Sequence, residues 1–166
     1  MAMEAYLALY ERTRDRAWVE RAARAADFAE TWLVCWDVPM GAAAATGRGP
    51  AVFFDRHASS VGLALVTLGF SAADTYLSRH AGDLLRLAEL TGDAHYARVG
   101  RLVLHNTKQM VQRGREFGYA RPGLQIEHWS LGRGRGYGLN SGWLPWVSTS
   151  HLLGIWSAEA ALTPGP

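Results

Sequence analysis

The sequence predicts an all-α fold built from antiparallel helical hairpins. The clearest hairpin lies in residues 72–111, where apolar residues recur at helical spacing on both sides of the turn Thr91-Gly92-Asp93. Gly92 suits the left-handed position that ends a helix, and Asp93 can accept the amide hydrogens that open the next one. Two helices joined by so short a turn must run antiparallel.

The same junction occurs earlier in the chain. Residues 9–18 match residues 87–96 at a constant offset of 78, with leucine, glutamate, threonine, aspartate and an aromatic residue in equivalent positions. The matched pairs are Leu9 and Leu87, Glu11 and Glu89, Thr13 and Thr91, Asp15 and Asp93, and Trp18 and Tyr96. Recurrence at a fixed spacing indicates an internal repeat of one helical hairpin.

The other elements follow from periodicity and from the distribution of glycine and proline. We expect helices over Ala2–Thr13, over residues 16–37 and over residues 147–162. With the central hairpin they give about two and a half hairpins in a single domain, residues 1–162, followed by a loose tail, 163–166. Two long irregular segments, 38–71 and 113–145, separate the helices. The apolar run 61–70 suits either a short strand pair or a buried turn of helix.

The composition is that of an ordinary globular protein. The chain has 166 residues, of which 49% are hydrophobic and 19% charged, and its formal net charge is +2. So small a charge gives no reason to expect nucleic acid, and the longest apolar run is about half the roughly 20 residues of a membrane span. We expect a soluble protein and favour the cytoplasm. The single cysteine, Cys35, excludes an internal disulfide and suits a buried apolar position.

The predicted topology gathers the unusual residues at one end of the bundle. If successive helices alternate in direction, the turns at 13–15 and 91–93 lie at one end and both irregular segments lie at the other. Aromatic and polar side chains there would hold a sugar ring through flat faces and directional hydrogen bonds, although rings that only pack a long loop would look the same. The candidate substrate-binding residues are His57, Tyr76, His80, Gln125, His128, Trp129, Tyr137, Trp143 and Trp146.

Three carboxylates are candidates for acid and base chemistry: Asp55, Asp74 and Glu127. Glu127 lies between an isoleucine and a histidine, where loss of water would favour the protonated form that a proton donor needs. Asp55 or Asp74 would act as base or nucleophile, because hydrolysis of a glycosidic bond needs two carboxyl groups about 5 to 10 Å apart. Simpler roles stay open, with Asp74 as a helix cap and Asp55 as the partner of an arginine.

The remaining motifs carry weaker signals. His57, His128 and His151 lack metal-ligand spacing such as HxxxH, so we expect no metal site and no cofactor. The glycine-arginine run 132–138 follows no strand and precedes no helix at the spacing that a dinucleotide requires, and it is too short for RNA binding. A serine hydrolase arrangement around His151 has no GxSxG motif to support it.

The two junction units, LALYERTRDRAWVERAARAADF and LLRLAELTGDAHYARVGRLVLHN, resemble the inner-to-outer helix junctions of the (α/α) toroid enzymes, the six-hairpin glycosidase superfamily. The resemblance covers residues 2–37 and 72–113, about half of the chain, and concerns architecture more than chemistry. Similar turns occur in terpene-cyclase toroids and other helical-hairpin arrays. The resemblance implies a partial toroid and, since a full toroid has six hairpins, the C-terminal portion of a longer enzyme.

The resemblance and the aromatic, acid-bearing segments together predict a carbohydrate-active, glycoside hydrolase-like segment, with a polysaccharide lyase as the less favoured chemistry. Its partners would be a carbohydrate ligand and either the remainder of the toroid or a second copy of the chain, with no nucleic acid and no membrane. Two alternatives stay open. One is a non-catalytic helical-repeat binding module, and the other is an inactive fragment of a larger toroid enzyme.

Overall fold

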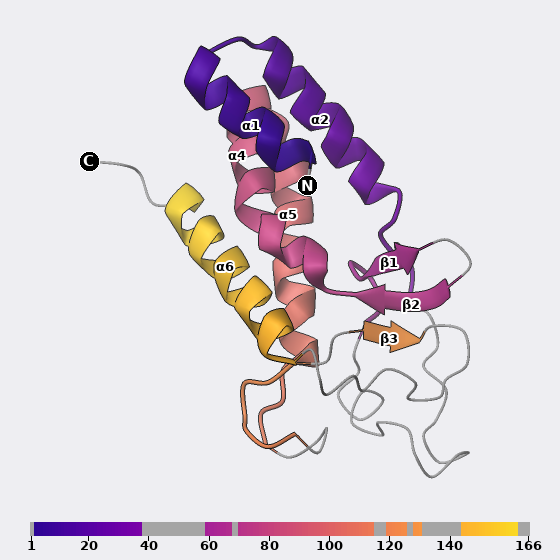
Figure 1. Cartoon of the computed structure of the whole chain (residues 1–166). Helices are drawn as coiled ribbons and strands as arrows, with labels where there is room; N and C mark the ends of the chain where they lie inside the picture. The colour runs from indigo at the N-terminus through magenta and orange to yellow at the C-terminus, as the bar shows by residue number, and fades with distance from the viewer. Residues whose placement is uncertain are drawn as a thin grey trace.

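The computed structural model describes residues 2–37, 59–67, 70–114, 119–125, 128–130 and 144–162. This part of the chain is mostly helical, as predicted, and carries one small sheet (Figure 1). The helices are α1 (Ala2–Thr13), α2 (Ala17–Glu30), α4 (Ala81–Thr91), α5 (Ala94–Thr107) and α6 (Leu144–Leu162), with the short 3₁₀ helices η2 (Tyr76–His80) and η3 (Lys108–Met110). The strands are β1 (Ala64–Thr67), β2 (Phe70–Asp74) and β3 (His128–Ser130).

The predicted repeat is confirmed at the two hairpin turns, which have the same hydrogen bonds. In each turn the threonine hydroxyl donates to the leucine carbonyl four residues earlier, at 2.8 Å in the first turn and 2.7 Å in the second. Asp15 and Asp93 then accept the backbone amide hydrogen two residues further on, at 2.9 and 2.8 Å. Asp93 is the N-cap of α5, whereas Asp15 immediately precedes Arg16, the N-cap of α2. The residue before each aspartate is left-handed, Arg14 with φ 58° and Gly92 with φ 75°.

The two hairpins share one hydrophobic core. Each helix buries an apolar stripe against its neighbours, because apolar residues three and four positions apart lie on one helix face. The core includes Met3, Leu7, Val19, Ala22, Ala26, Leu84, Leu87, Val99 and Val103. The α1–α2 turn and the α4–α5 turn lie at the same end of the bundle, and α6 runs alongside α4 (Figure 1).

The sheet lies at the opposite end of the bundle from the two turns (Figure 1). Its antiparallel strands have the order β1-β2-β3, with Ala64 opposite Asp74 on one side of β2 and His128 opposite Asp74 on the other. Of the two interpretations of residues 61–70, a short strand pair or a buried turn of helix, the strand pair is correct. The described parts of both irregular segments pack against one strand, which brings them together as the alternating helices predict.

Several element boundaries differ from the predictions. The first helix of the central hairpin does not begin near residue 72, because Ala72, Ala73 and Asp74 belong to β2. Helix α2 ends at Glu30, and residue 33 instead forms an isolated bridge with Ala64. The last helix begins at residue 144, three residues before the expected position. Cys35 is exposed and not buried as its apolar neighbours suggest.

Helix α6 exposes an apolar outer face. Leu152, Ile155 and Trp156 lie three and four residues apart, with 64%, 40% and 70% of their surfaces exposed. Its other face packs on α4 and η2, and Ala158 is buried in the shared core. Among the helices in the described part of the chain, none combines the length and the hydropathy that crossing a membrane requires.

Candidate functional site

The candidate site is a pocket of about 530 Å³ between helix α2, the end of β2 and the 3₁₀ helix η2. It brings together three of the residues predicted from the sequence, Asp74, Tyr76 and His80. The described residues that line it are Ala2, Ala25, Phe28, Ala29, Trp32, Ala64, Asp74, Tyr76, Leu77 and His80. Its volume falls within the range of roughly 300–1,000 Å³ that is typical of small-molecule sites.

The polar side of the pocket is organised by Asp74. This residue ends β2, it is only 7% exposed, and its Oδ1 accepts the backbone amide hydrogen of Tyr76 at 3.0 Å. An aspartate that accepts from the amide two residues later forms a tight turn, which here leads from the strand into η2. Tyr76, Leu77 and His80 follow on that single short helix, so they reach the same pocket. Asp74 is therefore a turn residue as well as a pocket residue.

The opposite wall is apolar and comes from α2 and the turn that follows it. Ala25, Phe28, Ala29 and Trp32 are spaced by three and four residues, which places them on one face. The Phe28 and Trp32 rings meet edge to face, with centroids 6.3 Å apart and an interplanar angle of 65°. Because Phe28 remains 66% exposed, part of this aromatic surface is open to a ligand.

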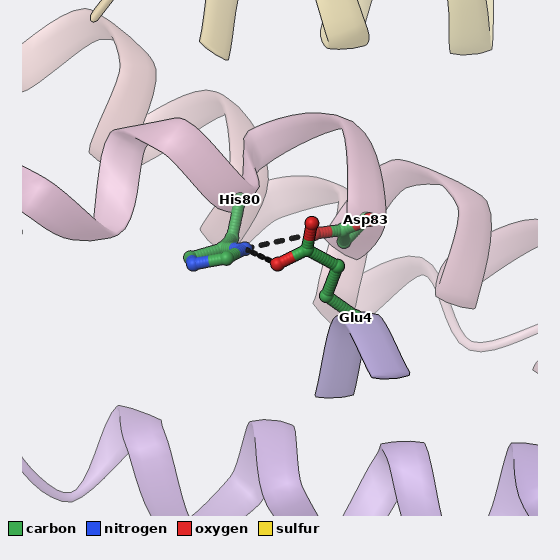
Figure 2. A group of neighbouring side chains, drawn as sticks. All are labelled: Glu4, His80 and Asp83. Atoms are coloured by element: carbon green, nitrogen blue, oxygen red, sulfur yellow. Dashed lines mark hydrogen bonds and ion pairs between the residues drawn. The ribbon is translucent and has the colours of Figure 1, made fainter. Parts of the chain in front are cut away.

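A cluster of three ionisable side chains adjoins the pocket at His80 (Figure 2). Nδ1 of His80 lies 2.8 Å from Oδ2 of Asp83, one turn along α4, and 3.9 Å from Oε2 of Glu4 on α1. The His80 side chain is 12% exposed, against 27% for Asp83 and 49% for Glu4. Figure 2 shows that one edge of the ring faces the two carboxylates and that the other edge points away from them. His80 thus connects the pocket to the cluster.

Gln125 and strand β3 lie close to the pocket. The backbones of His128 and Trp129 pair with those of Asp74 and Ala73 in the sheet. Gln125 is 1% exposed and donates from Nε2 to the hydroxyl of Thr75 at 3.2 Å. Gln125 therefore holds this segment against the residue that follows Asp74, and it does not line the pocket.

Of the remaining predicted site residues, only Trp146 is among those that the structure describes. Trp146 is 53% exposed on α6 and does not line the pocket. Five further predicted residues lie outside the described residues: Asp55, His57, Glu127, Tyr137 and Trp143.

Sequence reasoning missed the aromatic pair of the site, Phe28 and Trp32, and the two carboxylates beside His80, Asp83 and Glu4. Phe28 and Trp32 form an aromatic pair at four-residue spacing at the end of α2, a local pattern that could have been found. The spacing of His80 and Asp83 places both on one helix face, which is also a local signal. Glu4 could not be found in this way, because only the packing of α1 beside α4 brings it to His80.

Comparison with protein-family models, curated proteins and solved structures finds no match to this chain, so the resemblance to the six-hairpin glycosidases stays a prediction.

Proposed function

We propose that the pocket binds a carbohydrate and that the chain is a glycoside hydrolase-like segment of a partial (α/α) toroid. The observation that carries this proposal is the meeting of Asp74, Tyr76 and His80 with the aromatic pair Phe28 and Trp32 in one pocket. These elements are distant in sequence. Their convergence fits a ligand that needs both a flat apolar surface and directional hydrogen bonds.

Each half of the pocket supplies one kind of contact to a sugar. A sugar ring has a face of C–H groups that stacks on an aromatic ring, and Trp32 and the exposed part of Phe28 offer such surfaces. Its hydroxyl groups need acceptors and donors in fixed positions, and the Asp74 carboxylate and the His80 imidazole provide them. The buried turn at Asp74 holds the acceptor rigidly, which lowers the entropy lost on binding.

Hydrolysis needs a second carboxyl group beside the bond that breaks. In this proposal Asp74 acts as the base or nucleophile and Glu127 as the proton donor, with Asp55 as the other candidate for the first role. The sheet supports the choice of Glu127, because His128, which follows Glu127 in the sequence, pairs with Asp74.

The proposal is tested by glycan-array binding followed by turnover of the glycans that bind. We expect Trp32→Ala and Asp74→Asn to weaken binding at least tenfold, since one removes the stacking surface and the other removes the charged acceptor. Trp156→Ala is the matched control, because this exposed tryptophan on α6 does not line the pocket. Glu127→Gln should abolish turnover and retain binding. Turnover that survives this substitution would remove the proton-donor assignment.

A non-catalytic binding module is the second candidate, and the pocket lining favours it. Among the described residues, seven of the ten that line the pocket are apolar, namely all except Asp74, Tyr76 and His80. A sugar carries many hydroxyl groups, and three polar side chains satisfy only some of them. Binding without turnover in the unmodified chain, lost in Trp32→Ala, would identify a binding module.

The outer face of α6 supports the proposed partners. Leu152, Ile155 and Trp156 form an apolar face with no covering element among the described residues. In a toroid such a face packs against the next hairpin, and in an incomplete one it is covered by a second copy or left open. The open face is also what an inactive fragment of a larger toroid would show.

A further inference from the structure

Glu4, His80 and Asp83 place three potential metal ligands in one position. Their ligand atoms, one per residue, all lie within 4.8 Å of one another. The donors come from two parts of the fold, since Glu4 lies on α1, while His80 ends η2 as the N-cap of α4 and Asp83 lies in the first turn of α4. We propose that these three side chains bind a divalent transition metal ion, with Zn²⁺ as the preferred ion.

The spacing of the donors suits such an ion. Zn²⁺ binds nitrogen and oxygen at about 2.0–2.2 Å, so the ligand atoms of a tetrahedral site lie about 3.3 Å apart. His80 Nδ1 is 2.8 Å from Asp83 Oδ2 and 3.9 Å from Glu4 Oε2, one distance below that value and one above it. Glu4 is half exposed, so small rotations of its side chain can close the longer distance.

The charges of the cluster also favour a cation. Two carboxylates close together repel each other, and partial burial strengthens the repulsion because less water screens it. A divalent ion compensates both negative charges while the imidazole stays neutral and acts as a ligand through Nδ1. The alternative is a charged His80 that holds both carboxylates by itself. The two cases differ in whether a metal ion binds.

The types of donor select the ion. One imidazole and two carboxylates suit Zn²⁺ and neighbouring transition metals, whereas Ca²⁺ and Mg²⁺ prefer sites made of oxygen alone. Three protein ligands leave the fourth position of a tetrahedral ion open to water or to a ligand. Because His80 also lines the pocket, that open position would lie near the bound molecule.

The chain contains a matched pair for comparison. His95 Nε2 lies 2.7 Å from Glu30 Oε2, which resembles the His80–Asp83 contact in residue types and distance. This pair belongs to no group of three candidate ligands in the described part of the chain. We therefore expect the His95–Glu30 pair to contribute nothing to metal affinity.

The test is isothermal titration of the metal-free full chain with Zn²⁺, and with Co²⁺ while its visible spectrum is recorded. All variants carry Cys35→Ser, because the exposed thiol is a ligand for both metals. We expect one ion per chain and visible bands of low-coordinate Co²⁺. Glu4→Gln, His80→Asn and Asp83→Asn should each weaken binding at least tenfold, while His95→Asn and Glu30→Gln should leave it unchanged.

Three outcomes overturn the proposal: no binding, binding unchanged in Glu4→Gln and Asp83→Asn, or an equal loss in His95→Asn. Glu4→Gln is the decisive variant, since this exposed side chain on α1 can be changed without removing a core residue. Circular dichroism checks that each variant is folded. Because the measurement is metal binding and not turnover, its failure would leave the proposed sugar site untouched.

Discussion

Gly82 of α4 lies directly against Ser157 of α6: a Cβ added to Gly82 would lie 2.5 Å from both the carbonyl carbon and the carbonyl oxygen of Ser157. A second glycine, Gly154 of α6, meets the carbonyl of Ser78 in the same way. The last helix is thus fixed against α4 and η2 at two points where only glycine fits. The two contacts determine how closely α6 approaches the hairpins.

The contact at Gly82 predicts the sign of a stability change. Alanine is favoured over glycine in helices by about 1 kcal/mol, so Gly82→Ala would be stabilising if the contact were loose. Because the new methyl group would overlap backbone atoms, we expect Gly82→Ala to lower the free energy of unfolding by about 1–3 kcal/mol. Urea denaturation, monitored by circular dichroism, measures this change in the free energy of unfolding. A more stable variant would show that α6 does not pack on α4 in this way.

The elements that sequence reasoning predicted well are those determined by local chemistry. The hairpin turns depend on a threonine, a left-handed residue and an aspartate within three positions, and the same residues produce the same hydrogen bonds in both turns. The position of α6 was not predictable in this way. Small residues such as Gly82 and Gly154 indicate a close approach but do not say to which element.

The candidate site was predicted only in part for the same reason. Tyr76 and His80 lie near Asp74 in sequence, so their proximity follows from one turn and one short helix. The apolar wall comes from α2, and the third member of the charged cluster, Glu4, comes from α1. These contacts depend on how the hairpins pack, which periodicity does not specify.

The hydrogen bond between Tyr96 and Asp27 connects α5 of the second hairpin to α2 of the first. Tyr96 Oη donates to Asp27 Oδ1 at 2.8 Å, and burial, followed by this hydrogen bond, raises the pKa of Tyr96. We expect Tyr96→Phe to lower the free energy of unfolding by about 1 kcal/mol, since the exposed Asp27 can regain water. Tyr10→Phe is the control, because the Tyr10 hydroxyl makes no hydrogen bond among the described residues. An equal loss in both variants would contradict a specific role for the bond.

His151 makes stability depend on pH. It is 7% exposed, its Nδ1 has no hydrogen-bond partner in the described part of the chain, and burial, with Lys108 nearby, lowers its pKa from the usual 6.5. At His151 the unfolded chain therefore binds a proton at a higher pH than the folded chain. The contribution of this residue to the free energy of unfolding is constant well above pH 6.5 and falls as the pH falls through that value. We expect the free energy of unfolding, measured by urea denaturation, to fall less between pH 6.5 and pH 5 in His151→Leu than in the unmodified chain. If the free energy of unfolding fell equally with pH in both proteins, His151 would not be the source of the pH dependence.

The outer face of α6 predicts self-association of the chain. Large apolar side chains on one helix face drive contacts between copies unless another element covers them, so we expect the apparent mass to rise with concentration. Leu152→Lys combined with Trp156→Lys should return the chain to a monomer in sedimentation equilibrium. Trp36→Lys, at an exposed tryptophan outside α6, is the control. A mass independent of concentration would contradict this prediction.

The two hairpin turns predict opposite effects at equivalent positions. Arg14 has φ 58°, a left-handed conformation that costs a non-glycine residue about 1 kcal/mol, whereas Gly92 has φ 75° without that cost. We expect Gly92→Ala to lower the free energy of unfolding by about 1 kcal/mol, since nothing lies within 4 Å of the added Cβ and only the backbone conformation opposes the change.

Arg14→Gly should act in the opposite direction by a smaller amount, because it also removes the contact of the guanidinium with the Tyr10 ring, whose centroid is 5.8 Å away. Urea denaturation of both variants and of the double variant measures the two effects, which should add because the turns are independent. A neutral Gly92→Ala would show that the left-handed conformation carries no cost for alanine at this turn. The two turns would then share their sequence pattern but not the energetic requirement for a left-handed residue.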